Sequence, residues 1–259
     1  MGKDVQQRQI LAQDGQKLSY KAIGSGPIVM MLHGFCQWSQ MWIDNGVAQR
    51  LSERFTVILP DRRGHGYSSR PKRSEDFGMR MVEDVFRILD AEGQNKAHLV
   101  GFSQGSEVSW RAALECPDRI RSLVLISSGW PGPELDLALD GYAEILCWLP
   151  QAIADGEDWL TPNPDLETFQ AIVASIPEII DVPETVMAQL AVPTFGLVGS
   201  EDPEKRTIER LADLLPDFSL EILAETDHPE SSEHPNLPRL ISDFLESIEA
   251  RVPVASAQS

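Results

Sequence analysis

Short apolar runs recur along the chain and alternate with segments in which apolar positions follow a helical period. Six such runs cover residues 28–32, 55–59, 97–100, 122–126, 194–198 and 220–223. Apolar side chains at consecutive positions are typical of parallel strands that are buried on both faces of a sheet. The Asp14–Gly15 pair lies between two β-prone runs, so it predicts a hairpin that adds two strands before the first apolar run.

The intervening segments have helical spacing. Val82, Val85, Phe86 and Leu89 follow an i, i+3, i+4, i+7 pattern, and Gly93 after them predicts the end of that helix. A last helix is expected over residues 237–250. Strands that alternate with helices predict an α/β protein with an eight-stranded, mostly parallel sheet and helices on both of its faces.

One long segment departs from this alternation. Residues 130–190 contain amphipathic stretches and many prolines but no strand-like run. Because the segment comes between two predicted strands, we expect it to form a small helical cap over the carboxyl edge of the sheet. The sequence therefore predicts a core domain of residues 1–129 and 191–259, with a cap of residues 130–190 inserted into it. The length of 259 residues fits one sheet domain of this kind.

The charge of the chain is strongly negative, with 40 Asp and Glu against 22 Lys and Arg and a net charge of −18. Such a surface repels phosphate groups, so nucleic acids and membranes are not expected partners, and anionic substrates are disfavoured. The three cysteines are scattered, and the N-terminal residues lack the apolar stretch of a secretory signal, which together predict a cytoplasmic protein. The sequence leaves the oligomeric state open.

A nucleophile candidate follows the predicted strand 97–100. Gly101-Phe102-Ser103-Gln104-Gly105 matches the G-x-S-x-G pattern and is followed by a predicted helix that begins near Gln104. In such an elbow the serine occupies a strained turn that exposes its hydroxyl, and the glycines let the backbone pass closely. The motif therefore predicts that Ser103 is a catalytic nucleophile.

Two further segments strengthen this interpretation. His33-Gly34-Phe35 is similar to the oxyanion loop that follows the third strand of the α/β-hydrolase superfamily, and residues 61–68 resemble the D-x-R-G-x-G-x-S turn after its fourth strand. With the serine elbow, these segments make the chain resemble that superfamily from about residue 10 to 245, least within the cap. Within the superfamily, the chain resembles the esterase and haloperoxidase-like serine hydrolases. The motifs are specific for the fold and much less specific for the substrate.

The resemblance implies a base and an acid for Ser103. His228 follows strand 220–223 where the family places its base, and Pro235 lies seven residues further on, as in the family. His234 is the weaker alternative. Asp202, after strand 194–198, matches the position of the family's acid, and its neighbour Glu201 is the weaker candidate. The family usually has glycine where this chain has Asp227, which leaves the backbone before His228 open.

The same resemblance implies that the backbone N–H groups of Phe35 and Gln104 form the oxyanion hole. The aromatic side chains of Trp38, Trp130, Trp148 and Trp159, with Trp42, are expected to shape an apolar substrate pocket, although each could equally be a core residue. His33 and His65 are expected to be structural, and His98 to be a hydrogen-bonded core imidazole. No H-E-x-x-H or G-x-G-x-x-G motif occurs in the sequence, so neither a metal nor a cofactor is expected.

The function expected from these residues is the hydrolysis of small or medium, largely apolar carboxylic esters through an acyl-enzyme. Serine at the elbow argues against the related haloalkane dehalogenases and epoxide hydrolases, which need a carboxylate there. Hydrolysis of carbon–carbon bonds, peracid formation and cofactor-free oxygenation, suggested by Gly34-Phe35-Cys36, remain alternatives within the superfamily. A non-catalytic ligand-binding protein of the same fold is the alternative from another class.

Overall fold

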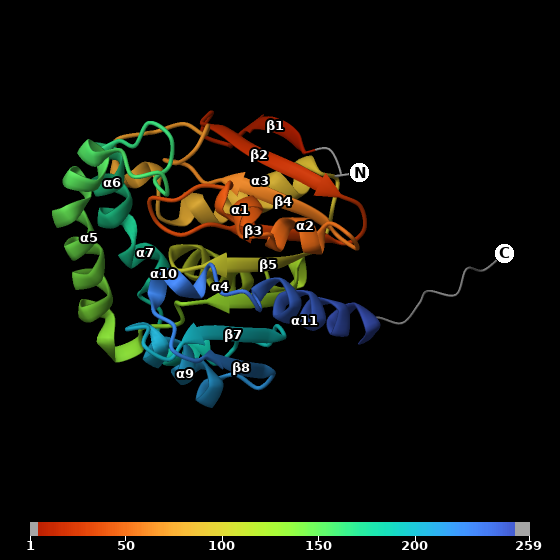
Figure 1. Ribbon diagram of the computed structural model, residues 1–259. Coiled ribbons are helices and arrows are strands. Elements are labelled where there is room, and N and C mark those ends of the chain that lie inside the picture. Colours follow the sequence, from red (N-terminus) through yellow and green to blue (C-terminus); the bar gives the residue numbers. More distant parts are fainter. Residues whose placement is uncertain (1–4, 252–259) are drawn as a thin grey trace.

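The structure, a computed structural model, describes residues 5–251 and contains one eight-stranded sheet (Figure 1). The spatial order of the strands is β1-β2-β4-β3-β5-β6-β7-β8. The antiparallel strands β1 and β2 form the N-terminal hairpin, β2 is antiparallel to β4, and all pairs from β4 through β3 to β8 are parallel. The strands are β1 (Gln6–Leu11), β2 (Lys17–Gly24), β3 (Ile28–Leu32), β4 (Thr56–Asp61), β5 (Ala97–Phe102), β6 (Ile120–Ile126), β7 (Thr194–Gly199) and β8 (Phe218–Leu223). The predicted eight-stranded, mostly parallel sheet is confirmed.

The described residues form helices on both faces of this sheet, together with those of the segment between β6 and β7. They are α1 (Met41–Asp44), α2 (Val47–Leu51), α3 (Met79–Ala91), α4 (Gln104–Glu115), α5 (Leu135–Asp155), α6 (Leu166–Ser175), α7 (Pro177–Ile180), α8 (Glu184–Met187), α9 (Lys205–Leu214), α10 (His228–Ser231) and α11 (Leu237–Arg251). The predicted helix that ends before Gly93 is α3, and the predicted last helix is α11.

Two apolar cores lie on opposite faces of the sheet, as the alternation of side chains along β3 shows. Met30 and Leu32 belong to the core that includes the apolar residues of α3 and α4, whereas Val29 and Met31 belong to the core that includes those of α2 and α11. Successive side chains of a strand point to opposite faces, so a strand that is apolar throughout must be covered on both. The continuous apolar runs in the sequence have this cause.

The segment between β6 and β7 contains helices α5 to α8 and no strand; the structure describes all of its residues. Figure 1 shows α5, α6 and α7 together at one end of the sheet. Residues of α5 line one cavity with residues that follow β5 and β8, which places α5 at the carboxyl ends of the strands. The division of the chain into a core domain and a cap remains a prediction.

Strand β5 continues two residues beyond the run seen in the sequence. Gly101 and Phe102 still pair with Leu125 and Ile126 of β6, so the strand leads directly into Ser103. The polar N-terminal stretch includes residues 1–4, which lie outside the described residues. Within residues 5–251, no helix is both long and apolar enough to cross a membrane.

Candidate active site

Ser103 occupies a tight turn between β5 and α4. Its backbone has φ 52° and ψ −124°, a combination that residues other than glycine rarely adopt. A Cβ atom on Gly101 would lie 2.4 Å from the backbone of Gly105, and one on Gly105 would lie 2.1 Å from the carbonyl oxygen of Leu32. Both glycines of the motif are therefore required by close backbone approach, and the turn presents the Ser103 hydroxyl at the start of α4.

The structure brings Ser103, His228 and Asp202 together from three strand ends. His228 Nε2 lies 3.1 Å from Ser103 Oγ, and His228 Nδ1 lies 3.1 Å from Asp202 Oδ1. A carboxylate can only accept a hydrogen bond, so Nδ1 carries the proton that Asp202 accepts, and Nε2 of the neutral ring is free to accept the proton of Ser103. The arrangement is that of a nucleophile, a base and an acid that orients the base.

The protonation of His228 is set by its surroundings. Burial lowers the pKa of His228. The hydrogen bond to Asp202 and the charges of Asp202 and Glu204 together raise it by more than burial lowers it, so the net pKa lies above the ordinary 6.5. Asp202 is held in place because its Oδ1 also accepts the backbone N–H of Glu204 at 2.8 Å. The raised pKa makes His228 a stronger base toward the Ser103 proton.

The residue before His228 has no need to be glycine. Asp227 has an extended backbone, with φ −93° and ψ −170°, which any residue can adopt. Its side chain caps α10 by accepting the backbone N–H of Glu230 at 3.0 Å, and the Glu230 side chain accepts the N–H of Asp227 in return. This capping box fixes the start of the short helix that carries His228.

The weaker candidates for acid and base lie elsewhere. Glu201 is exposed, whereas the Asp202 side chain is buried against His228. His234 accepts the backbone N–H of Asn236 and has no contact with Ser103 within the described residues. His98 is buried and contacts Ser122 and Glu249, and burial lowers its pKa to about 3. It is the core imidazole that the sequence predicts.

The two backbone groups expected to stabilise an oxyanion lie on adjoining elements. Gln104 is the first residue of α4, so its N–H has no acceptor within the helix. Phe35 follows β3, and its ring packs against His65, Tyr142 and Phe169. No hydrogen-bond acceptor for the Phe35 N–H is found among residues 5–251. Both donors therefore remain available to a ligand.

A cavity of about 250 Å³ opens beside Ser103 and His228. Its apolar wall comes largely from α5, with Ala138, Ile145 and Trp148. Trp148 is 44% exposed and makes an edge contact with Trp159, whose ring centroid is 6.0 Å away. Of the four tryptophans proposed as substrate-binding residues, Trp148 alone is among the lining residues of this cavity.

The other tryptophans occupy different places. Trp38 and Trp159 line a separate groove of about 730 Å³, and Lys21 lies over the Trp38 ring. Trp130 is 3% exposed and donates its Nε1 hydrogen to the carbonyl oxygen of Val182, so it is a core residue and does not line the cavity. Trp42 is also fully buried, in the core beside α2 and α11. These two residues pack in the core and not in the substrate pocket that the sequence suggested.

Three carboxyl groups also line the cavity: Glu107, Glu144 and Glu204. Glu107, on the first turn of α4, accepts hydrogen bonds from the hydroxyls of Tyr142 at 2.6 Å and Ser128 at 3.3 Å. Burial raises the pKa of Glu107 to about 7. Sequence reasoning missed Glu107, although its place four residues after Ser103 puts both on one side of the helix start.

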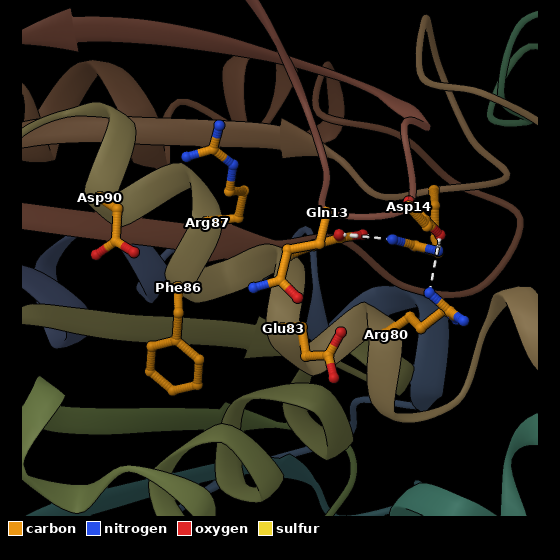
Figure 2. Close-up of a pocket in the computed structure, with 9 residues that line it drawn as sticks. Gln13, Asp14, Arg80, Glu83, Phe86, Arg87 and Asp90 are labelled. Atoms are coloured by element: carbon orange, nitrogen blue, oxygen red, sulfur yellow. Dashed lines mark hydrogen bonds and ion pairs between the residues drawn. The ribbon is translucent and has the colours of Figure 1, made fainter.

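The basic residue of the D-x-R-G-x-G-x-S turn is structural. Arg63 is buried and forms ion pairs with Asp84 of α3 and with Asp14 of the hairpin turn. Figure 2 shows the small cavity beside these groups, of about 150 Å³, where Arg80 also contacts Asp14. Four of the charged groups that line this cavity are thus paired with each other: Asp14, Arg63, Arg80 and Asp84. Among the described residues, no three His, Cys, Asp or Glu side chains group so as to hold a metal ion.

The chain is similar to known proteins of one fold family. A family model described as "alpha/beta hydrolase fold" matches residues 27–165. A fluoroacetate dehalogenase from Burkholderia sp is 37% identical over 107 residues, which are 40% of this chain and 34% of that protein. The chain spans about a third of the length of the curated relatives that it matches, for example 33% of a Mycobacterium bovis protein that is 36% identical over 120 residues. Epoxide hydrolases are also among the similar proteins.

Solved structures share the whole fold. A carboxylesterase from Nitrososphaera gargenis superposes with a TM-score of 0.80 at 19% identity and covers 95% of this chain and 100% of that one. A thermophilic esterase from Thermogutta terrifontis, solved with malate bound, gives a TM-score of 0.76 at 23% identity, over 94% of this chain and 99% of the other. Identities this low show the fold alone. With the matching family model and the elbow at Ser103, the chain belongs to the alpha/beta hydrolase fold family.

Proposed function

We propose that the protein is a serine hydrolase that cleaves small, largely apolar carboxylic esters through an acyl-enzyme. The observation that carries the proposal is the hydrogen-bonded series Ser103–His228–Asp202, with both contacts at 3.1 Å, beside a cavity. A serine hydroxyl is a poor nucleophile unless a neighbouring base accepts its proton, and this series supplies that base in its neutral form.

In the proposed reaction, Ser103 Oγ attacks the ester carbonyl carbon while His228 Nε2 takes the hydroxyl proton. The negative charge that develops on the carbonyl oxygen is stabilised by the N–H groups of Phe35 and Gln104. His228 then gives its proton to the leaving alcohol, which leaves an acyl-Ser103 ester. Water then attacks this ester while His228 takes a proton from it, and His228 returns that proton to Ser103 Oγ as the carboxylic acid leaves. Asp202 remains ionised and stabilises the imidazolium that forms twice in the cycle.

The cavity indicates the kind of ester. A volume of about 250 Å³ lies just below the usual range for small-molecule pockets, so it suits a short acyl or alcohol group. Its apolar wall would contact alkyl groups, and the Glu144 carboxylate would repel a carboxylate on the substrate. The segment 130–190 would act as a cap, because α5 supplies that apolar wall. A neutral ester with a short acyl or alcohol group is the substrate class that these features favour.

A panel of p-nitrophenyl esters of increasing acyl length tests the proposal. Ser103→Ala and His228→Ala should each reduce kcat by about 10⁵–10⁶-fold. His234→Ala is the matched control and should leave kcat within about twofold. Equal losses in the two histidine variants, or residual turnover of Ser103→Ala within tenfold of the wild type, would contradict the assignment. A protein that turns over no ester and whose Ser103 does not react with a fluorophosphonate would instead be a binding protein.

A further inference from the structure

The peptide between Gly34 and Phe35 carries one of the two proposed oxyanion donors, and its carbonyl oxygen is held by two side chains. His33 Nδ1 lies 2.8 Å from Gly34 O, and Arg62 Nη2 donates to the same oxygen at 3.1 Å. The backbone N–H of Gln37 also donates to it, at the longer distance of 3.4 Å. No cis peptide bond occurs within residues 5–251, so this peptide is trans. In a trans peptide the N–H points opposite to the C=O. The groups that hold the Gly34 carbonyl thus set the direction of the Phe35 N–H.

The protonation state of His33 is fixed by its contacts. His33 Nε2 lies 3.0 Å from the backbone nitrogen of Arg62 and accepts its hydrogen. Burial and the charge of Arg62 hold the pKa of His33 well below the ordinary value, so the ring is neutral. A neutral imidazole that accepts at Nε2 carries its proton on Nδ1. That proton is then donated to the Gly34 carbonyl.

Arg62 lies in the turn that follows β4. The Arg62 side chain is buried, and its Nε and Nη1 have no hydrogen-bond partner among the described residues. Within residues 5–251, no carboxylate forms an ion pair with Arg62. Burial lowers the pKa of Arg62 to about 10, which leaves it charged at neutral pH. A buried guanidinium with unsatisfied donors destabilises a fold. The hydrogen bond that its side chain does form goes to Gly34.

The rest of the loop is also held. The Cys36 N–H donates to His65 Nε2 at 3.2 Å, and the Cys36 carbonyl accepts the backbone N–H of Thr161 at 2.8 Å. A Cβ atom on Gly34 would lie 2.9 Å from the Phe102 ring, so the loop packs directly against the strand that leads to Ser103. The groups on either side of the Phe35 N–H thus have partners, while this N–H is left for a ligand.

We propose that Arg62 is a positioning residue for the oxyanion site, which with neutral His33 fixes the Gly34–Phe35 peptide so that the Phe35 N–H faces the substrate carbonyl at Ser103. This inference rests on the proposed ester hydrolysis. The positive charge of Arg62, which lies beside the Gly34 carbonyl oxygen, also polarises the peptide and strengthens the Phe35 N–H as a hydrogen-bond donor. Because the oxyanion forms only on reaction, the effect of Arg62 falls on the transition state and not on substrate binding.

The test compares Arg62→Met with Arg70→Met. Arg70 is the matched control because it also donates to backbone carbonyls, those of Gly66 and Pro162, but not to Gly34. Removal of a whole oxyanion donor costs about 10²–10³-fold in kcat, so its misplacement in Arg62→Met should cost about 10–100-fold with KM within about threefold. The inhibition constant of an aryl trifluoromethyl ketone, which forms an oxyanion on the serine, should rise by the same factor. Arg70→Met should leave both quantities within about threefold.

Equal kcat losses in both variants, or a loss in Arg62→Met that appears only in KM, would overturn the inference while leaving the esterase proposal intact. If Arg62→Met does not fold, Arg62→Lys, which keeps the charge, is expected to lose less than tenfold in kcat with unchanged KM, and a change in KM alone would overturn the inference. Nitrogen-15 NMR of the wild-type histidines adds a readout that needs no turnover. It should show His33 protonated at Nδ1 only, and a proton on Nε2 would contradict the held carbonyl.

Discussion

Replacement of Glu107 by glutamine should change how the stability of the protein depends on pH. The Glu107 carboxyl is buried between the hydroxyls of Tyr142 and Ser128, and burial raises its pKa from 4.5 to about 7 despite both hydrogen bonds. In the unfolded chain the same carboxyl titrates near 4.5. Between these two values the folded protein therefore binds about one more proton than the unfolded chain.

The sign and size of the effect follow from this difference. Stability falls as pH rises wherever the folded state holds the extra proton, so the contribution of Glu107 is fully present below about pH 4.5 and is lost as pH rises to about 7. The difference between about 7 and 4.5 is about 2.5 pKa units, which at 1.36 kcal/mol per unit gives about 3 kcal/mol. Glutamine is neutral throughout, can accept from Tyr142 and can donate to Ser128, so it avoids this loss.

Urea denaturation of the wild type and of Glu107→Gln between pH 5 and 8 measures the effect. The free energy of unfolding of the variant, relative to the wild type, should rise by about 2–3 kcal/mol over this range, because the first part of the effect already occurs below pH 5. Glu115→Gln is the matched control, because Glu115 lies on the same helix but is exposed and pairs with Arg111. A Glu107→Gln difference that stays constant within about 0.5 kcal/mol from pH 5 to 8 would refute the reasoning.

Further predictions concern the base, the cavity and the core. The acid limb of the kcat/KM profile for ester hydrolysis should have its midpoint above pH 6.5, because Asp202 raises the pKa of His228; Asp202→Asn should lower that midpoint and reduce kcat by about 10⁴-fold, and an unmoved midpoint would contradict the pairing. Glu144→Gln should raise kcat/KM about fivefold for a p-nitrophenyl ester whose acyl chain ends in a carboxylate, with no rise for the neutral ester of equal length, since one like charge is removed; a similar change for both esters would speak against charge exclusion. Trp148→Ala should raise KM for apolar acyl chains about tenfold with little loss of stability, whereas Trp130→Ala should lower the free energy of unfolding by about 3–5 kcal/mol in urea titrations; the opposite pattern would mean that their places are exchanged.

Much of the fold could be predicted because its strands are buried on both faces. Continuous apolar runs locate these strands in the sequence. The helix that ends before Gly93 could be predicted because its apolar residues form a regular stripe. Strand β5 was predicted two residues short because Gly101 interrupts the run, although it still pairs with Leu125. Apolarity reports burial and does not report the backbone ladder that continues past a glycine.

The arrangement of Ser103, Asp202 and His228 was accessible because each follows the end of a strand, where parallel strands bring their carboxyl ends to one edge. The choice of Asp202 over Glu201 needed the family resemblance, since two adjacent carboxylates differ only in which one the turn directs inward. Asp227 shows the limit of that resemblance. An extended backbone and a capping side chain suffice where glycine is usual.

The lining of the cavity could not be predicted from composition. Trp130 and Trp148 belong to the same segment, but only the packing of that segment decides which ring faces Ser103 and which enters the core. The contact of Glu107 with Tyr142 joins α4 to α5 across 35 residues, and no local pattern reports it. Arg62 would be expected in solvent from its charge, and only the structure shows that it is buried behind Gly34.

The central claim is that Ser103 forms a covalent acyl intermediate, and trapping that intermediate tests it most directly. The enzyme is mixed with p-nitrophenyl acetate, quenched in acid within the first turnovers and digested for peptide mass spectrometry, with Ser103→Ala treated identically. We expect a burst of p-nitrophenol and one acetyl group on the peptide that contains Ser103, both absent from the variant. Ester turnover by the wild type without acetylated Ser103, or an acetyl group found equally in Ser103→Ala, would contradict the account.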